Sequence, residues 1–544
     1  MLQNDRIWMA QGDNPCYLLL NQANRHGLIA GASGTGKTVT LKVMAEGFSQ
    51  AGVPVFMADV KGDVTGMCQA GVDSESMQKR IQKFGLQGFT YQGCPARFWD
   101  MMGGPGIPVR VTISDMGPVL LSRLLGLTQV QEGVLNIVFR IADDRQMLLI
   151  DLKDLRAMLN YVSEHAKEYT TTYGNVSSQS VGAILRALIA VEDQGGDTFF
   201  GEPSLELSDW FACDPSGCGY VNILNAARII QQPQIYSMFL LWMLSDLFEK
   251  LPEVGDLDKP RFVFFFDEAH LLFKDMPSEL LNKIVQVVKL IRSKGVGVYF
   301  ITQSPSDIPG EVLAQLSNRV QHGLRAYTPA EQKAVKAAAE AFRANPNFKS
   351  EDVILELGTG EALVSFLDEE GKPSVVENAK ILPPQCLMAE ASDEAKAAVA
   401  QGQMALMVKY GTAIDRESAY EKIMDEREQN VAAEELAKER AKLEAEKAEF
   451  AKQQEAAQKA AEKEAERQQK AAEKEAERQA RAAEREAERQ ARAAEREAER
   501  LAKAEERERQ KQRDAMSRVA TNILSSAGRT AANQIVRGIF GTRR

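Results

Sequence analysis

Eight consecutive residues have the types and the spacing of a loop that binds a nucleoside triphosphate. They are Gly31, Ala32, Ser33, Gly34, Thr35, Gly36, Lys37 and Thr38. The glycines let the backbone turn closely enough for several N–H groups to face phosphate oxygens. We expect Lys37 to reach the β- and γ-phosphates and the Thr38 hydroxyl to bind Mg²⁺. The chemistry predicted by this segment is the binding of ATP together with Mg²⁺.

Two acids that follow a continuous apolar run form the second chemical feature. Residues 262–266 are all apolar, and Asp267 and Glu268 come directly after them. Asp267 is placed to hold Mg²⁺ through water, and Glu268 to orient or deprotonate the attacking water. The alternative is a core strand that runs into a solvated acidic turn. The phosphate-binding loop favours the catalytic interpretation, because a nucleotidase needs both halves of the site.

A glutamine and two arginines complete the candidate site. Gln303 follows the apolar run 296–302 and is placed to sense the γ-phosphate. Arg319 and Arg325 come shortly afterwards, and either one is a candidate for a finger that reaches the phosphate of a neighbouring subunit. The alternative for each arginine is a surface or ion-pair residue.

The elements that must position these residues are strands and helices in alternation. The apolar run 28–30 predicts a buried strand before the loop, and residues 39–45 predict a helix after it. Residues 53–58 predict another strand, which ends at a cluster of Asp59, Lys61 and Asp63. Strands as apolar as 262–266 are typical of a parallel sheet covered by helices on both faces. Ligands bind at the carboxyl edge of such a sheet.

The chain organisation follows from changes in periodicity and composition. We predict an α/β fold with a mostly parallel central sheet, a helical insertion and a long C-terminal helix. The predicted segments are the first part of the core (1–115), a mainly helical insertion (116–205), the second part of the core (206–390), a linker (391–415), a long helix rich in Ala, Glu and Arg (416–513) and a basic amphipathic segment (514–544).

The long helix contains an 11-residue unit that repeats four times, beginning at Lys459, Lys470, Arg481 and Arg492. Eleven residues in three turns favour a slightly right-handed supercoil. Alanines form one stripe, and acids precede bases at i,i+4 spacing, which supports a helix without a partner. A coiled coil that joins subunits and a solvated single helix that acts as a spacer both fit this pattern.

The last segment differs from the helix before it. Residues 516–544 carry five arginines and no acid, together with scattered Val, Ile, Leu and Phe. A basic amphipathic end can dock on an acidic protein face, an anionic membrane surface or nucleic acid. A partly ordered tail is the alternative.

Composition narrows the class of protein. The 544 residues are 44% hydrophobic, and six cysteines show no paired CxxC spacing, so we expect neither a disulfide framework nor a zinc ribbon. No apolar run is long enough to span a bilayer, and we expect a cytoplasmic protein. Residues 1–400 hold 35 Lys+Arg and 47 Asp+Glu, a net charge of −12. A broad basic footprint for nucleic acid is therefore not evident in these totals.

Five segments in order resemble the HerA/FtsK superfamily of ring-forming ATPases, and most of all its YjgR-like, HerA-helicase-like bacterial branch. They are HGLIAGASGTGKT, ADVKGD, FVFFFDEAHLLF, VYFITQSPSDIP and NRVQHGLRAYTP. The resemblance implies a RecA-like P-loop core, ATP, Mg²⁺ and a hexamer with composite sites. By position, Lys37 and Thr38 match the Walker A residues, and Asp267 and Glu268 the Walker B pair. Gln303 matches the sensor, and Arg319 or Arg325 the finger.

Two functions of different classes remain open at this stage. The first is a motor that resembles DNA translocases or helicases and hydrolyses ATP in a ring. The second is an ATP-gated scaffold, in which the nucleotide domain switches assembly while the helical tail binds protein or membrane partners without DNA. DNA-stimulated turnover favours the motor, and nucleotide-dependent oligomerisation without DNA binding favours the scaffold.

Overall fold

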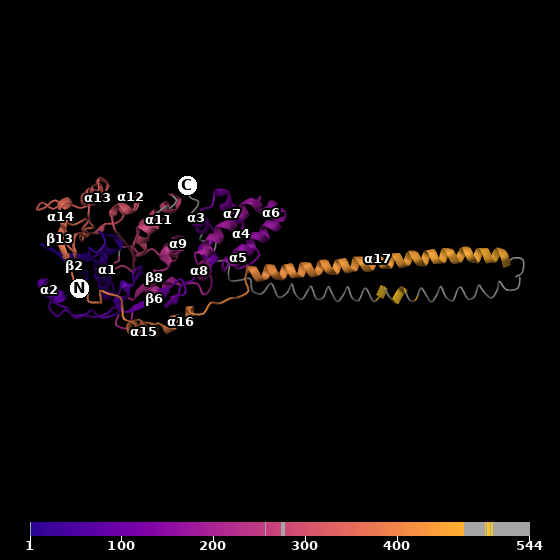
Figure 1. The fold of residues 1–544 in the computed structure, drawn as a ribbon, viewed down its shortest axis with the longest axis horizontal. Helices are drawn as coiled ribbons and strands as arrows, with labels where there is room; N and C mark the ends of the chain where they lie inside the picture. The colour runs from indigo at the N-terminus through magenta and orange to yellow at the C-terminus, as the bar shows by residue number, and fades with distance from the viewer. Residues whose placement is uncertain are drawn as a thin grey trace. The chain divides into compact units, whose positions relative to one another are not determined.

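Apolar segments along the first 381 residues form the strands of one large sheet (Figure 1). A computed structural model describes residues 2–255, 257–273 and 278–472, together with 496, 498–500 and 502–503. The parallel strands are β4 (Gly27–Ala30), β5 (Val55–Asp59), β6 (Ala96–Asp100), β7 (Ile107–Pro108), β8 (Val221–Asn225), β9 (Phe262–Phe266), β10 (Val296–Thr302) and β11 (Asn318–His322). The antiparallel strands are β1 (Leu2–Gln3), β2 (Arg6–Gln11), β3 (Pro15–Leu19), β12 (Glu361–Ser365) and β13 (Glu377–Ile381).

The order of these strands puts the phosphate-binding loop near the middle of the sheet. Among the described residues the order is β1-β2-β13-β12-β11-β4-β10-β9-β5-β8-β6-β7, and β3 pairs with β2. Every pair from β11 to β7 is parallel, and the antiparallel pairs lie at the other end. This arrangement confirms the predicted α/β fold with a mostly parallel sheet.

Helices cover both faces of the parallel strands. Those that surround the sheet are α1 (Lys37–Gln50), α2 (Glu75–Lys83), α9 (Pro233–Lys250), α10 (His270–Phe273), α11 (Ser278–Ile291), α12 (Gly310–Leu313), α13 (Pro329–Glu340) and α14 (Ser350–Glu356). On one face, Phe48 of α1 contacts the rings of Phe265 and Tyr299. On the other face, Phe239 of α9 packs on Phe56. Because side chains alternate along a strand, an all-apolar strand such as β9 contributes buried side chains to the hydrophobic cores on both faces of the sheet.

A block of helices is inserted between β7 and β8. It consists of α3 (Ile113–Leu124), α4 (Gln129–Asp144), α5 (Leu152–Glu164), α6 (Ala166–Tyr173), α7 (Ser178–Asp193) and α8 (Gly196–Phe199). Side chains at the N-termini fix where the main helices begin. Thr128 and Gln131 form a reciprocal capping box on α4, and Asp151 and Asp154 form another on α5. Such caps satisfy N–H groups that the first helical turn leaves unpaired.

Residues 382–420, which we call the strap, follow the last strand. The strap includes α15 (Asp393–Gly402) and α16 (Met404–Tyr410), so the segment expected as a linker, 391–415, contains two helices. At its start, the fully buried Lys42 of α1 donates to the carbonyls of Leu387 and Met388 at 2.7 and 3.1 Å. Further on, the buried Tyr410 donates its hydroxyl to Asp209. The strap is therefore held at several points along its length.

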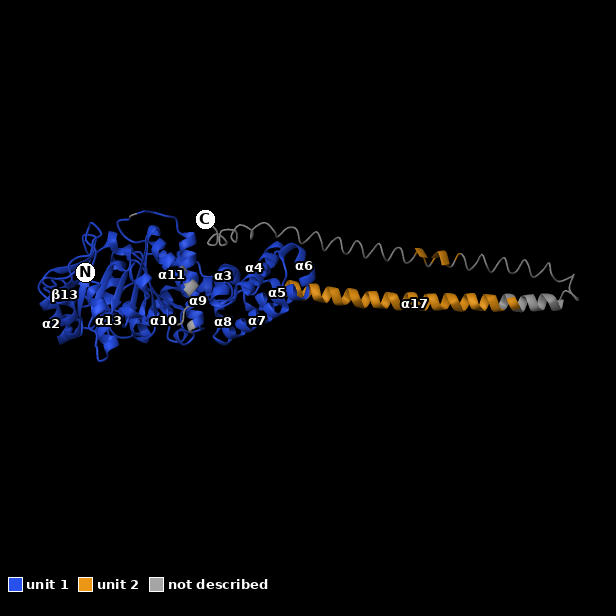
Figure 2. Ribbon diagram, turned by 90° about the horizontal axis from the view of Figure 1, so that it is seen from above, with its two compact units in different colours: residues 1–420, 536–544 blue, residues 421–535 orange. Residues whose placement is uncertain are grey.

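The chain divides into two compact units between Tyr420 and Glu421 (Figure 2). In the second unit, α17 (Ala419–Ala472) continues as the predicted long helix, and every residue from 427 to 460 is exposed. Its ion pairs include Glu434 with Lys438 and Glu455 with Lys459, both at i,i+4 spacing. Local pairs of this kind support a helix without burial. The repeat that begins at Arg481 and the basic segment 514–544 lie outside the described residues, as do most residues of the repeats that begin at Lys470 and Arg492.

No helix in the described part of the chain has the length and apolar character needed to cross a membrane.

Candidate functional site

The predicted phosphate-binding loop lies between β4 and α1, as its sequence context requires. Gly31, Gly34 and Gly36 have φ values of 155°, 78° and 116°, which favour glycine. A Cβ at Gly31 would lie 2.5 Å from the Cβ of His322, so this position also lacks space for a larger residue. The N–H of Gly31 donates to Thr302 at 3.2 Å, and that of Ala32 donates to Gly323 at 2.9 Å. The ends of β10 and β11 therefore fix the loop from both sides.

Lys37 and Thr38 occupy the first turn of α1. The Lys37 Nζ donates to the carbonyl oxygens of Gly31 at 2.6 Å and Ala32 at 3.1 Å. Burial lowers the pKa of Lys37, and the carboxylates of Glu268 and Asp267 oppose that change. The ammonium thus lies across the loop, where a bound phosphate would provide a stronger, charged partner. Ser33 and Gly34 at the tip of the loop are exposed.

The two acids lie at the same edge of the sheet as the loop. In the parallel register, Phe266 of β9 pairs with Phe300 of β10, and Thr302 of β10 pairs with Ala30 of β4. The carboxyl ends of these strands therefore face the same side. Burial, followed by the charge of Glu268, raises the pKa of Asp267 to about 6. A partly buried carboxylate of this kind is stabilised in its charged form when a cation binds beside it.

Glu268 has an unusual backbone and several polar neighbours. Its φ of 49° lies in the left-handed region, which is uncommon for a residue other than glycine. Its carboxylate lies 3.3 Å from Lys61 Nζ, and Gln303 Nε2 donates to it at 3.5 Å. Nδ1 of His270 lies 3.3 Å from the same carboxylate without a hydrogen bond. The structure therefore brings Lys61 and Gln303 to one carboxylate, although they follow two different strands.

The loop that carries Lys61 is fixed by a buried acid at the end of β5. One carboxylate oxygen of Asp59 accepts from the N–H of Gly62 at 2.7 Å, and the other accepts from the N–H of Thr65 at 3.0 Å. Asp59 is 3% exposed. Because its oxygens bind the backbone of the loop, Asp59 orients Lys61 toward the acid pair. The sequence indicated the cluster of Asp59 and Lys61 but not the contact between Lys61 and Glu268.

The two candidate arginines lie in different environments. The guanidinium of Arg319 donates to the carbonyls of Leu316 at 2.9 Å, Leu313 at 3.1 Å and Ala341 at 3.4 Å. Burial lowers the pKa of Arg319. Arg325 follows β11 at the edge that holds the phosphate-binding loop, and its side chain is exposed. Arg319 is therefore held within its own chain, whereas Arg325 is accessible to a second molecule.

A buried histidine beside the loop was not identified from the sequence. The ring of His322, at the end of β11, contacts Thr40 Oγ1 at 2.8 Å and the carbonyl oxygen of Glu361 at 3.0 Å. Burial lowers its pKa to about 4, so the ring is neutral near pH 7. The sequence did contain one sign of this role: His322 is a polar residue at the carboxyl end of β11, and ligands bind at that edge of a parallel sheet.

The site fits Mg²⁺ held mainly by water and phosphate. Within the described residues, no group of three or more His, Cys, Asp or Glu side chains is arranged to hold a metal ion. Mg²⁺ keeps several waters and takes few protein ligands, so one hydroxyl and one carboxylate are a sufficient set. The half-buried Asp267 would supply the carboxylate, and Thr38 in the first turn of α1 would supply the hydroxyl.

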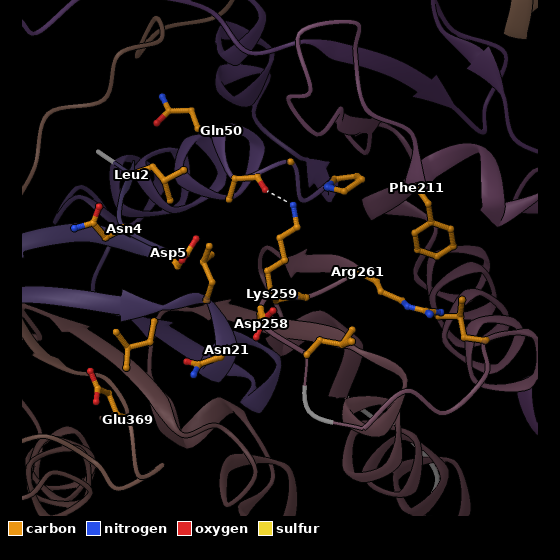
Figure 3. Close-up of a pocket in the computed structure, with 18 residues that line it drawn as sticks. Leu2, Asn4, Asp5, Asn21, Gln50, Phe211, Asp258, Lys259, Arg261 and Glu369 are labelled. Carbon is orange, nitrogen blue, oxygen red and sulfur yellow. Dashed lines mark hydrogen bonds between the residues drawn. The ribbon is translucent and has the colours of Figure 1, made fainter.

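The opposite edge of the sheet holds a cavity of about 1120 Å³ (Figure 3). Pro54 and Arg261, which directly precede β5 and β9, line it. Lys259 donates to the carbonyl of Ala51 at 2.6 Å, and Asp5 and Asp258 also line the cavity. The phosphate-binding loop and the acid pair lie at the other ends of these strands. This cavity is therefore separate from the candidate site.

A glycine-rich loop between a strand and a helix, with an acid pair at the end of a nearby parallel strand, is the arrangement typical of P-loop proteins. Comparison with known proteins narrows this class. The family model described as Helicase HerA-like C-terminal matches residues 4–473. The chain therefore belongs to this family, within the HerA/FtsK superfamily of P-loop ATPases. No curated protein matches the sequence.

Several solved structures are similar in fold. The bacterial conjugative coupling protein TrwBΔN70 is 16% identical, with 68% of this chain and 87% of that chain covered and a TM-score of 0.42. TrwB in complex with ADP and Mg²⁺ is 15% identical, with 68% and 88% covered and a TM-score of 0.42. VirB4 of Thermoanaerobacter pseudethanolicus is 15% identical, with 73% and 100% covered and a TM-score of 0.41. The assignment of this chain to its family rests on the match of the family model to residues 4–473 and not on these TM-scores.

Proposed function

We propose that this protein is a Mg²⁺-dependent ATPase that works as a ring-forming motor. One observation carries the proposal: Lys37 of the phosphate-binding loop and the pair of Asp267 and Glu268 lie at one edge of the sheet. Electrostatic coupling of Lys37 to both acids supports their proximity. Bound ATP would supply the triphosphate, and its hydrolysis would supply the free energy for movement.

Each residue in the proposed site has a separate task. The loop 31–36 and Lys37 bind the phosphates, and Thr38 and Asp267 hold Mg²⁺. Glu268 orients and deprotonates the attacking water, since a general base must lie within hydrogen-bond reach of that water. Gln303, which already contacts Glu268, senses the γ-phosphate.

The proposed ring, a hexamer, completes each site with an arginine from the adjacent subunit. Arg325 is our choice for this finger, because it is exposed and follows the strand next to β4. The three carbonyls bound to Arg319 favour a structural role for that residue. An arginine supplied from a second molecule stabilises the charge that develops during phosphoryl transfer.

DNA is the leading substrate, since the family is described as helicase-like. Steady-state ATP hydrolysis, measured with and without single- and double-stranded DNA at low and physiological salt, tests this proposal. We expect DNA to stimulate turnover and salt to weaken the stimulation, because phosphate contacts release counterions. If neither wild type nor Glu268→Gln hydrolyses ATP, the proposed ATPase activity is refuted.

A scaffold that is gated by ATP is the second candidate, and the exposure of α17 favours it. The side chains from 427 to 460 are all exposed, including the large apolar residues Leu436, Leu443 and Phe450. Such a helix is available to a protein partner. Light scattering with ATP, ADP or no nucleotide distinguishes the candidates: assembly that depends on nucleotide, with hydrolysis indifferent to DNA, supports the scaffold.

A further inference from the structure

Glu268 is enclosed by side chains on both of its carboxylate oxygens. Oε1 pairs with Lys61 Nζ at 3.3 Å, while Oε2 accepts from Gln303 and lies near His270. Its side chain is only 12% exposed. A general base needs an oxygen that faces the attacking water. In this arrangement the oxygen that faces Lys61 is not available for that task.

The ion pair between Lys61 and Glu268 is of a kind that allows Lys61 to leave the carboxylate for another anion. The side chain of Lys61 is 56% exposed, and an ion pair with one solvated partner is weak and costs little to break. The backbone of its loop is fixed, however, because Asp59 binds the N–H groups of Gly62 and Thr65. The ammonium can therefore move on a flexible stem while its loop stays in place.

The γ-phosphate of ATP lies within reach of that movement. A water activated by Glu268 has to lie within hydrogen-bond distance of the carboxylate and about 3–3.5 Å from the phosphorus that it attacks. A γ-phosphate attacked by that water would therefore lie close to the Lys61 ammonium, which contacts the same carboxylate. Lys37 and Lys61 both follow parallel strands, β4 and β5, whose carboxyl ends lie at the same edge of the sheet.

We propose that Lys61 binds the γ-phosphate as a second lysine and thereby releases Glu268. Without ATP, Lys61 pairs with Glu268 and holds the base inactive. When ATP is bound, Lys61 leaves the carboxylate for the phosphate, whose greater charge makes it the stronger partner. ADP lacks this group, so Lys61 stays on Glu268. This inference rests on the proposed ATPase function and adds a regulation of the same site.

The difference between ATP and ADP provides the test. We would measure by calorimetry the dissociation constants of ADP and of ATPγS for wild type, Lys61→Met and Lys61→Arg, each with Mg²⁺. Lys61→Met is expected to weaken ATPγS binding about tenfold and to change ADP binding less than about twofold, the difference expected from one charge-assisted contact. Lys61→Arg is expected to retain most of the discrimination, because it keeps the charge.

A second pair of variants tests the exchange itself. Glu268→Gln removes the competing carboxylate, so ATPγS should bind several-fold more tightly while ADP is unchanged. In the double variant Lys61→Met/Glu268→Gln this gain should disappear, which is the non-additivity expected of two residues in contact. Lys79→Met is the matched control, since Lys79 forms an exposed ion pair with Glu75 on α2.

The outcomes separate this inference from the function on which it rests. Equal changes in ADP and ATPγS binding for Lys61→Met, or no change in either, would overturn the role of Lys61 while leaving the ATPase intact. A gain in Glu268→Gln that survives in the double variant would overturn the exchange. Failure of wild type to bind either nucleotide would refute the proposed ATPase, and the inference with it. Melting temperatures within the wild-type range show that each variant is folded.

Discussion

The two edges of one sheet hold different chemistry. At the carboxyl edge, Lys37, Asp267 and Glu268 are partly buried, and the two carboxylates oppose the lowering of the Lys37 pKa that burial causes. At the amino edge, Lys259 and Asp258 line the cavity of Figure 3, and Lys259 is bound to a helix-end carbonyl. A cavity alone therefore does not identify the candidate site here. The direction of the parallel strands does, because their carboxyl ends bring together loops from distant parts of the chain.

Removal of the proposed finger should have the largest effect. We expect Arg325→Ala to lower turnover about 10³-fold without a change in melting temperature, since a finger in trans is worth at least that much. Arg319→Ala should instead cost about 1–3 kcal/mol of stability, because it leaves carbonyls unpaired. Denaturant melts and ATPase assays on both variants check this. Activity regained when Arg325→Ala is mixed with Lys37→Ala would support the trans contact, and equal behaviour of the two arginines would contradict it.

Removal of the proposed general base, Glu268, should have the second-largest effect on turnover. Glu268→Gln is expected to lower turnover about 10²- to 10³-fold, the usual contribution of a general base, while nucleotide binding persists. Single-turnover hydrolysis and a binding titration on the same sample separate the two effects. Turnover similar to that of wild type would remove Glu268 from its assigned role.

Removal of the proposed phosphate-binding lysine, Lys37, should weaken nucleotide binding. Lys37→Ala is expected to weaken ATPγS binding about 100-fold, because it removes charge-assisted contacts to two phosphates. The carbonyls of Gly31 and Ala32 lose one donor each, so a loss of stability of about 1 kcal/mol should accompany the loss of affinity. A fluorescent nucleotide displaced by ATPγS gives the affinity. An unchanged affinity would place the nucleotide elsewhere.

Low pH should weaken Mg²⁺-dependent nucleotide binding, because Asp267 becomes protonated. Its pKa of about 6 means that protons compete with Mg²⁺ below that pH, so affinity for Mg²⁺·ATPγS should fall about tenfold per pH unit there. The raised pKa also means that the nucleotide-free fold loses stability as pH rises from about 4 through 6. Asp267→Asn should therefore be more stable than wild type at pH 7 but not at pH 4. Affinities and melts from pH 4 to 7.5 check both trends, and a flat profile would contradict them.

A change at the amino edge should have the smallest effect. Lys259→Met removes one hydrogen bond to Ala51, and we expect turnover to change less than about twofold, as for most surface substitutions. The ATPase assay used for the other variants is sufficient. A larger loss would show that the two edges are coupled and that the cavity belongs to the working site.

Much of the fold and part of the site could be predicted from the sequence. The glycine-rich loop and the apolar strand before Asp267 are local patterns, and each carries its own structural context. The choice between Arg319 and Arg325 could not be predicted, because it depends on carbonyls at Leu313 and Ala341 that only the folded chain brings near.

The contacts that the sequence did not indicate join residues far apart in the chain. Lys61 and Glu268 meet at the ends of the neighbouring strands β5 and β9, and His322 at the end of β11 meets Thr40 of α1, the helix that follows the neighbouring strand β4. The confirmed parallel order supplies the reason, since it places these strand ends side by side. What the sequence predicts for the basic terminus and for most of the last three repeats concerns residues outside the described part and stays a prediction.

The contrast between the strap and α17 has a practical consequence for handling the protein. Lys409 and Arg416 in the strap form ion pairs with Glu206 and Glu202 on the body of the first unit. In α17, by contrast, basic side chains from 427 to 460 project into solvent. A protease specific for lysine and arginine would therefore trim the helix well before it cut the strap. The natural fragment for crystallisation ends close to residue 420 and retains every residue of the proposed nucleotide site.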